Sequence, residues 1–293
     1  MITKPLVSIC IPTYKRYDQL KVCIENALGQ DYDNIEVLVS DDTQDEPVPE
    51  WLQSLSNQES KLRYIKQPTT LGLVLNNTFV RKKAKGKYLC IMHNDDEFPA
   101  NYISKMMQVL DANPSCSLVG PSCVRYFNGS FWYDYEAYSS LGLTQFERLK
   151  DITIRAFNNP WMFEHLLHGV YRRDVLPQGF DFAYWRSIIF FFYLCSIKGP
   201  IHSVQDVKMI KHTTSENVES YANPKYIVRN PLMIRLLNRR QEERLTVLYR
   251  LMRAIVSSKD IKARDKSSIL LIAVKTYVMN KMEFSCPLPD DVF

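Results

Sequence analysis

The chain has 293 residues, of which 46% are hydrophobic and 24% are charged, with only nine glycines and a formal net charge of +5. This composition excludes a disordered or low-complexity chain and predicts one large domain, or one domain with an appendage. The modest charge gives no reason to expect a nucleic-acid partner.

The charge is unevenly distributed along the chain. From residue 223 onward there are fourteen Lys and Arg against seven Asp and Glu, a balance of +7, which leaves residues 1–222 near −2. The basic region is either an ordinary solvated helical face or a surface for anionic lipid or a diphosphate-linked substrate.

The seven cysteines form no CxxC pair, which favours reduced thiols in a cytosolic protein. Strand-like residues begin at the N-terminus, so we expect no signal peptide. The longest apolar run, residues 188–197, is far shorter than the roughly 20 residues that span a bilayer. We therefore expect a cytoplasmic protein, with peripheral contact to the inner face of the plasma membrane left open.

The first ninety residues alternate between predicted strands and helices. Apolar runs predict the strands, and residues with helical spacing follow each of the first three. The expected strands are 6–11, 35–39, 62–65 and 88–92, with helices beginning near 18, 51 and 72. This pattern predicts an α/β fold with a mostly parallel sheet covered by helices and right-handed crossovers.

The rest of the chain continues with mixed elements. We expect a helix at 101–110, strands at 117–119, 122–126 and 168–173, a buried helix at 187–197, an edge strand at 204–210 and helices over the final 70 residues. The predicted organisation is a domain over 1–215, with halves at about 1–100 and 101–215, and a basic helical extension over 216–293.

Polar residues follow three of the predicted strands. They are Thr13, Tyr14 and Arg16; Asp41 and Asp42; and Asp95 and Asp96. The ends of parallel strands share one edge of a sheet, where open α/β sheets bind ligands. Such acids can accept hydrogen bonds from a nucleotide, and the last pair can hold a divalent cation on a diphosphate. The alternative is that these acids lie in solvated turns.

The sequence has neither GxGxxG nor GxxxxGK[ST], which disfavours a dinucleotide fold and a phosphate-loop NTPase. Several segments, in this order over about residues 5–215, instead resemble glycosyltransferase family 2, which has the GT-A fold. They are 7–16, 35–43, 72–77, 93–96, 101–119 and 168–173.

The resemblance implies a role for each matching residue. Nucleotide-sugar contacts would come from Pro12, Thr13, Tyr14, Arg16, Asp41, Asp42, Asn77 and Asp95. Asp96, with Asp95, would hold Mn²⁺ or Mg²⁺, and His168, Tyr171 and Arg172 would lie on the acceptor side. His212, after the last predicted strand, could complete the metal shell or could be structural.

The resemblance further implies an inverting enzyme that moves a sugar from a nucleotide-diphosphate sugar to a glycan or a polyprenyl-diphosphate-linked saccharide in bacterial polysaccharide biosynthesis. In that reaction a carboxylate deprotonates the acceptor hydroxyl. The chain departs from the family at the Glu-Asp pair that usually supplies this base, so Asp181 is the expected base and Glu164 the second candidate.

Three further features bear on this interpretation. The first acid of the metal motif is replaced by His93 or Asn94, and Asn76 stands where the family often has arginine. The missing Glu-Asp pair leaves open a degenerate member that binds nucleotide or glycan without turnover. A sugar nucleotidyltransferase is a weaker alternative, because the loop after the first strand lacks the glycines of a phosphate loop.

Overall fold

The structure is a computed structural model that describes residues 4–158, 160–175, 187–214 and 239–279. Its strands are β1 (Val7–Thr13), β2 (Ile35–Asp41), β3 (Leu62–Lys66), β4 (Tyr88–Ile91), β5 (Asp96–Glu97), β6 (Leu118–Phe127), β7 (Ser130–Tyr135), β8 (Val170–Arg172) and β9 (Ile201–Thr213). Its helices are α1 (Tyr17–Leu28), α2 (Glu50–Gln58), α3 (Leu73–Lys83), α4 (Tyr102–Ala112), α5 (Gln145–Asn158), α6 (Ser187–Lys198), α9 (Arg239–Ser257) and α10 (Ala263–Met279). Two 3₁₀ segments, η1 (Pro160–His168) and η2 (Arg173–Val175), flank β8.

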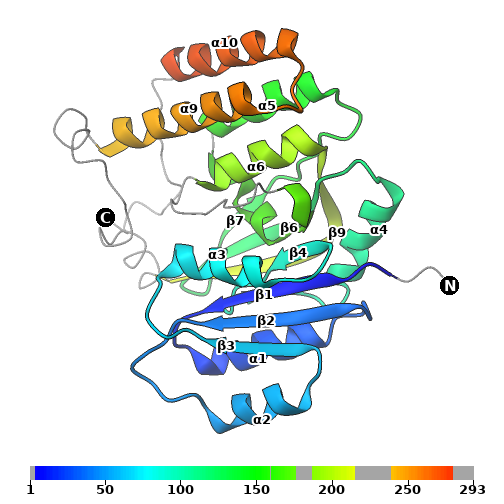
Figure 1. Ribbon diagram of the computed structural model, residues 1–293, viewed down its shortest axis with the longest axis vertical. Helices are drawn as coiled ribbons and strands as arrows, with labels where there is room; N and C mark the ends of the chain where they lie inside the picture. Colours follow the sequence, from blue (N-terminus) through cyan, green and yellow to red (C-terminus); the bar gives the residue numbers. More distant parts are fainter. Residues whose placement is uncertain (1–3, 159, 176–186, 215–238, 280–293) are drawn as a thin grey trace.

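The strands form one sheet in the order β3-β2-β1-β4-β8-β6-β9-β5, with β7 paired to β6 (Figure 1). The first four are parallel. Strand β8 is antiparallel to both β4 and β6, whereas β9 runs parallel to β6. The expected α/β fold is confirmed, with a parallel half that continues into a mixed half.

Side-chain alternation in the central strands builds the two faces of the sheet. Ile9 and Val37 belong to a hydrophobic cluster with the buried residues of α1 and α4. Cys10 and Leu38, one residue further on, belong to a second cluster with Val80 of α3 and with α5 and α6. Because both faces are buried, these strands read as continuous apolar runs, as parallel strands do.

Two of the expected strands differ from the observed ones. The strands expected at 117–119 and 122–126 are one strand, β6, whose register against β9 shifts between Pro121 and Ser122. Proline lacks the backbone N–H that a regular ladder needs, and a bulge accommodates it. The strand expected at the edge, residues 204–210, lies within β9. The two-residue strand β5 pairs only with Ile210 and Lys211, so residues 204–209 have β6 as their only strand neighbour in the described part of the chain, as an edge strand does.

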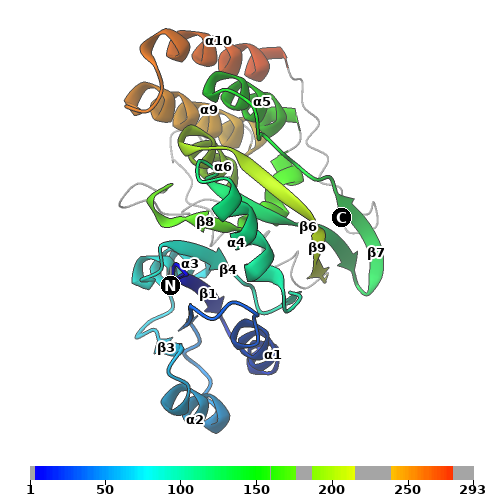
Figure 2. The same cartoon turned by 90° about the vertical axis from the view of Figure 1, so that its right-hand side faces the viewer.

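Helices α9 and α10 pack with α5 and α6 at the end of the molecule opposite to α2 (Figures 1 and 2). Buried residues of both helices, including Leu251, Ile255 and Ile269, join the same hydrophobic cluster as Cys10 and Tyr171. The described part of the predicted basic extension therefore shares its core with the sheet. Within the described ranges, no helix combines the length and the apolar character needed to cross a bilayer.

Candidate active site

The loop after β1 begins the candidate site. Pro12 and Thr13 are buried, whereas Tyr14 is 50% exposed. Lys15 and Arg16 both have a left-handed backbone, with φ of 58° and 56°. This conformation costs non-glycine residues of order 1–3 kcal/mol each and persists only where surrounding contacts hold it. Here the Thr43 hydroxyl accepts the Lys15 N–H at 2.6 Å.

The acids after β2 are saturated with donors from the protein. Asp41 accepts hydrogen bonds from the hydroxyls of Tyr17 (2.9 Å) and Tyr64 (2.6 Å), from Lys66 Nζ (3.1 Å) and from the Thr43 N–H. Burial alone would raise the pKa of Asp41, but the hydroxyl and N–H donors outweigh it and hold the pKa below its usual value.

Asp42 differs from Asp41 in the groups that its carboxylate contacts. Its two carboxylate oxygens accept the backbone N–H groups of Leu71 (2.6 Å) and Gly72 (2.7 Å). Gly72 has φ of 82°, which favours glycine, and it precedes the first residue of α3. Asp42 therefore fastens the start of α3 to the end of β2.

Two neighbouring asparagines of α3 also lie at this edge. The Asn76 amide donates to the carbonyl oxygens of Thr13 (3.2 Å) and Ser40 (3.0 Å) and so ties β1 to β2. Asn77 donates to Leu73 O, and its own Oδ1 is buried with no hydrogen-bond partner among the described residues. The loop geometry thus depends on Asn76. From the sequence, this residue was noted only because it stands where the family often has arginine.

Asp95 and Asp96 point in different directions after β4. The Asp95 side chain is 20% exposed and its Oδ2 lies 3.3 Å from Arg16 Nη1, so it faces the loop after β1. Asp96 belongs to β5, and its side chain is 1% exposed. Asp95 lies in the turn before β5, whereas Asp96 is the first residue of that strand, and the two acids therefore have different surroundings.

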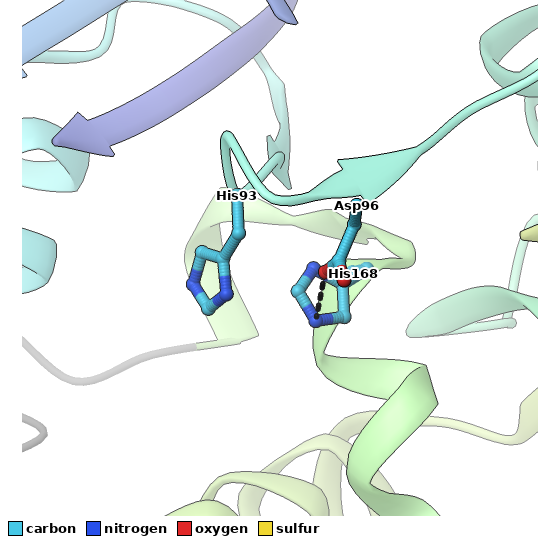
Figure 3. A group of neighbouring side chains, drawn as sticks. All are labelled: His93, Asp96 and His168. Atoms are coloured by element: carbon cyan, nitrogen blue, oxygen red, sulfur yellow. Dashed lines mark ion pairs between the residues drawn. The ribbon is translucent and has the colours of Figure 1, made fainter. Parts of the chain in front are cut away.

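Asp96 lies in a cluster with the half-buried His93 and the buried His168 (Figure 3), and the buried Lys211 joins them. Lys211 Nζ lies 3.1 Å from Asp96 Oδ2 and 3.1 Å from His168 Nε2. His168 reaches the cluster because Gly169 follows it: a Cβ on that glycine would lie 2.5 Å from Val119 O. The rings of His93 and His168 meet edge to face at 4.7 Å.

The electrostatics of this cluster follow from burial and from Lys211. Burial raises the pKa of Asp96 to about 7, although Lys211 opposes the shift. Burial and the Lys211 charge lower the pKa of His93 to about 4, and they hold the pKa of His168 well below its usual value. Burial would lower the pKa of Lys211, but Asp96 and Glu164 raise it. At neutral pH the histidines are neutral and Lys211 is charged.

A second buried ion pair lies beside the first. Arg125 Nη2 lies 2.9 Å from Glu164 Oε1, and the Tyr135 hydroxyl donates to Glu164 Oε2 at 3.1 Å. Arg125 and Lys211 are partners in the register of β6 and β9. Burial would raise the pKa of Glu164, but the charges of Arg125 and Lys211 hold it below its usual value.

The remaining predicted site residues lie apart from this cluster. His212 Nε2 lies 2.6 Å from Glu97 Oε1, and its ring stacks on Tyr126. Glu97 follows Asp96 in β5, and the side chains of these two residues point to opposite sides of that strand. Tyr171 is buried against Phe191, and Arg172 donates to Cys116 O and Tyr88 Oη. Of the three acceptor-side residues, only His168 lies in the cluster. Asp181 lies outside the described residues.

Residue types that can bind a divalent cation are present, but most of them already contact other side chains of the protein. His93, Asp96 and His168 offer ligand atoms within 4.8 Å of one another, and His93 Nε2 is buried without a hydrogen-bond partner in the described chain. Lys211 nevertheless contacts the ligand atoms of the other two residues. Asp95 is paired with Arg16, and His212 with Glu97. As arranged, these residues do not fit a bound metal ion.

Sequence reasoning missed Lys211, Arg125 and the cluster role of His93. Lys211 and Asp96 are separated by 115 positions, and only the pairing of β5 with β9 brings them together. One signal was available. Both cations occupy strand positions whose side chains should point into the protein core, where an unpaired charge is costly.

A family model described as Glycosyl transferase family 2 matches residues 8–180. An uncharacterized glycosyltransferase of Rickettsia bellii is 28% identical over 72% of this chain and 32% of its own length. A GalNAc(5)-diNAcBac-PP-undecaprenol beta-1,3-glucosyltransferase of Campylobacter jejuni is 26% identical over 41% of this chain and 38% of its own. The chain thus spans well under half the length of these two relatives.

Solved structures share the fold. S. aureus TarS 1–349 in complex with UDP-GlcNAc matches 94% of this chain and 72% of that one, with a TM-score of 0.58 and 14% identity. The mannosyltransferase PcManGT of Pyrobaculum calidifontis in complex with GDP-Man and Mn²⁺ matches 96% and 89%, with a TM-score of 0.53 and 14% identity. The expected GT-A architecture is confirmed, and the family match favours a glycosyltransferase over a nucleotidyltransferase.

Proposed function

Because the chain belongs to glycosyl transferase family 2, we propose that it moves a sugar from a nucleotide-diphosphate sugar to a hydroxyl of a glycan or lipid-linked saccharide, with inversion at the anomeric carbon. The observation that carries the proposal is the convergence of the loop after β1, the acids after β2 and Asp95 at one edge of the sheet. The UDP-GlcNAc bound to TarS and the undecaprenol-linked substrate in the name of the Campylobacter relative support it.

The nucleotide would bind where the exposed groups lie. The exposed Tyr14 ring can stack on a base, and the Arg16 guanidinium can form a bidentate hydrogen-bonded pair with a phosphate. Asp95, beside Arg16, can accept a ribose hydroxyl. Asp41 and Asp42 already accept hydrogen bonds from the protein, so their proposed role is to shape the base end of the crevice.

The proposed catalytic base is Asp181, with Glu164 as the second candidate. An inverting transfer needs a carboxylate that accepts the proton of the acceptor hydroxyl as the new glycosidic bond forms and the bond to the diphosphate breaks. Glu164 is poorly suited, because Arg125 and Tyr135 occupy both of its oxygens and its pKa is lowered. The Mn²⁺ or Mg²⁺ expected from the sequence has no part in these steps, since Asp96 is bound to Lys211.

The acceptor would approach at a membrane surface that presents a polyprenyl-diphosphate-linked saccharide. Helices α9 and α10 carry exposed apolar side chains, namely Tyr249, Val256, Leu271, Val274 and Val278. Exposed basic residues, Arg253, Lys259, Lys262 and Lys275 among them, lie on the same helices and the turn between them. Apolar and basic groups together favour binding to anionic headgroups. Salt-sensitive binding to phosphatidylglycerol vesicles would support this contact.

The test of the proposed function is a panel of nucleotide-sugars. A donor that binds the native state raises the melting temperature, and the stabilising donor is then incubated with undecaprenyl-diphosphate saccharides to look for transfer. Asp181→Asn should remove transfer and leave donor binding unchanged, whereas Glu164→Gln should retain measurable transfer. Donor binding without transfer or hydrolysis in the wild type would favour the degenerate alternative, and no stabilisation by any donor would contradict the proposal.

A further inference from the structure

Lys211 is enclosed at the centre of the buried cluster. Its side chain is 7% exposed, and its Nζ lies 3.1 Å from both Asp96 Oδ2 and His168 Nε2. The distance between His168 Nε2 and Asp96 Oδ2 is 3.7 Å. The ammonium therefore contacts both of these ligand atoms, which themselves lie close together (Figure 3 shows the two residues).

The hydrogen bonds determine which way each group donates. His168 Nδ1 lies 3.1 Å from the carbonyl oxygen of Ile91, which can only accept, so Nδ1 carries the ring proton. In the neutral ring, Nε2 then has a lone pair, and it accepts a hydrogen bond from Lys211, which can only donate. A metal ion would need this same lone pair and the same Asp96 carboxylate. One lone pair serves one cation at a time.

Each buried carboxylate of the cluster already has a cation beside it. Lys211 Nζ lies 3.1 Å from Asp96 Oδ2, and Arg125 Nη2 lies 2.9 Å from Glu164 Oε1. A divalent ion added to these groups would leave two uncompensated positive charges in a desolvated place, which is strongly unfavourable. Removing the lysine would leave one anion in excess and two ligand residues with free electron pairs.

We propose that the Lys211 ammonium is the resident cation of this site, occupying the position of a divalent ion between Asp96 and His168 and excluding a metal from the His93, Asp96 and His168 group. Lys211 is a positioning residue: it holds Asp96 in β5, and β5 holds the turn from which Asp95 faces Arg16. One consequence rests on the proposed function, namely that donor binding at this edge needs no added divalent ion.

Electron paramagnetic resonance of Mn²⁺ tests the proposal without any nucleotide. The full chain is titrated with Mn²⁺ alone, and the free-ion signal is measured. The wild type should leave the signal of free Mn²⁺ unchanged, whereas Lys211→Ala, which removes the ammonium and opens space, should bind one Mn²⁺ at least about tenfold more tightly. Adding Asp96→Asn to Lys211→Ala should abolish this gain.

Two control variants keep the result interpretable. Lys208→Ala removes an exposed lysine of the same strand and should behave as the wild type. Lys211→Arg keeps a cation and should bind no Mn²⁺. Wild-type binding of Mn²⁺ that disappears in Asp96→Asn would overturn the proposal, even if Lys211→Ala fails to fold. A folded Lys211→Ala that gains no Mn²⁺ affinity would overturn it as well.

The consequence for the donor is measured separately by calorimetry. UDP should bind the wild type with the same affinity in EDTA as in Mn²⁺, and a tenfold or greater loss in EDTA would contradict metal-independent binding. If neither UDP nor GDP binds under any condition, the proposed function fails. The Mn²⁺ titration of Lys211→Ala still decides the role of Lys211 in that case.

Discussion

Asp41 and Asp96 are both buried carboxylates at strand ends, yet their surroundings stabilise charge in different ways. Asp41 accepts bonds from two tyrosines, a lysine and a backbone N–H, and its pKa is lowered. Asp96 accepts a hydrogen bond from Lys211 alone among the described residues, and burial raises its pKa to about 7. Several neutral donors keep a carboxylate ionised more securely than a single enclosed cation does, because each donor adds stabilisation without another charge to desolvate.

The largest expected effect comes from removing the single cation at Asp96. Lys211→Met leaves a buried carboxylate without compensation and should lower the free energy of unfolding by ~3–5 kcal/mol. Urea denaturation measures this loss. The double variant Lys211→Met/Asp96→Asn should recover most of the stability, and Lys208→Met should change it by less than about 0.5 kcal/mol. No recovery in the double variant would contradict the pairing.

The neutral histidines around Asp96 make that side of the molecule sensitive to acid. His165 is buried, and burial lowers its pKa from 6.5 to about 3. The unfolded state therefore binds the proton first, and stability is lost as pH falls below 6.5, by about 3 kcal/mol at pH 4. The raised pKa of Asp96 acts in the opposite sense, so the comparison of variants isolates the histidine.

His165→Phe should reduce the loss of stability between pH 6.5 and pH 4, and denaturant titrations at each pH measure it. His212→Gln, at an exposed histidine, serves as the matched control. Equal acid sensitivity in the wild type and His165→Phe would show that His165 is not held neutral by burial.

A smaller effect is expected at the donor-rich acid. Asp41→Asn keeps the shape but weakens the bonds from Tyr17 and Tyr64, and it should cost about 1.5–3 kcal/mol. The loop after β1 should also bind UDP less well, because Asp41 and Thr43 together hold Lys15. Thermal unfolding and UDP calorimetry measure both effects, and unchanged values would place the organisation of this edge elsewhere.

The smallest effect is expected for the lysine at Asp41. Lys66 is 30% exposed, and three other donors remain on Asp41 when it is removed. Lys66→Met should therefore cost about 0–1 kcal/mol. A loss as large as that of Lys211→Met, in the same urea assay, would refute the contrast between the two sites.

Much of the parallel half could be predicted from the sequence. Strands at 6–11, 35–39 and 88–92 are buried on both faces, and this burial leaves an apolar run that is visible in one dimension. The polar residues after these runs had to meet at one edge. The hydrogen-bond donors of Asp41 could not be predicted from such a local pattern. Tyr64 and Lys66 belong to another strand, β3, whose register against β2 depends on packing.

The sequence by itself determined the alternation of strands and helices, the family resemblance and the edge at which Thr13, Asp41 and Asp95 meet, because these depend on local periodicity and on the directions of neighbouring strands. Only the tertiary structure decided that Asp96 faces inward to Lys211, that Glu164 is held by Arg125, and that His168 joins them while Tyr171 and Arg172 do not. Such pairs link residues 39 to 115 positions apart. Their contacts depend on strand order and register, which no local pattern specifies.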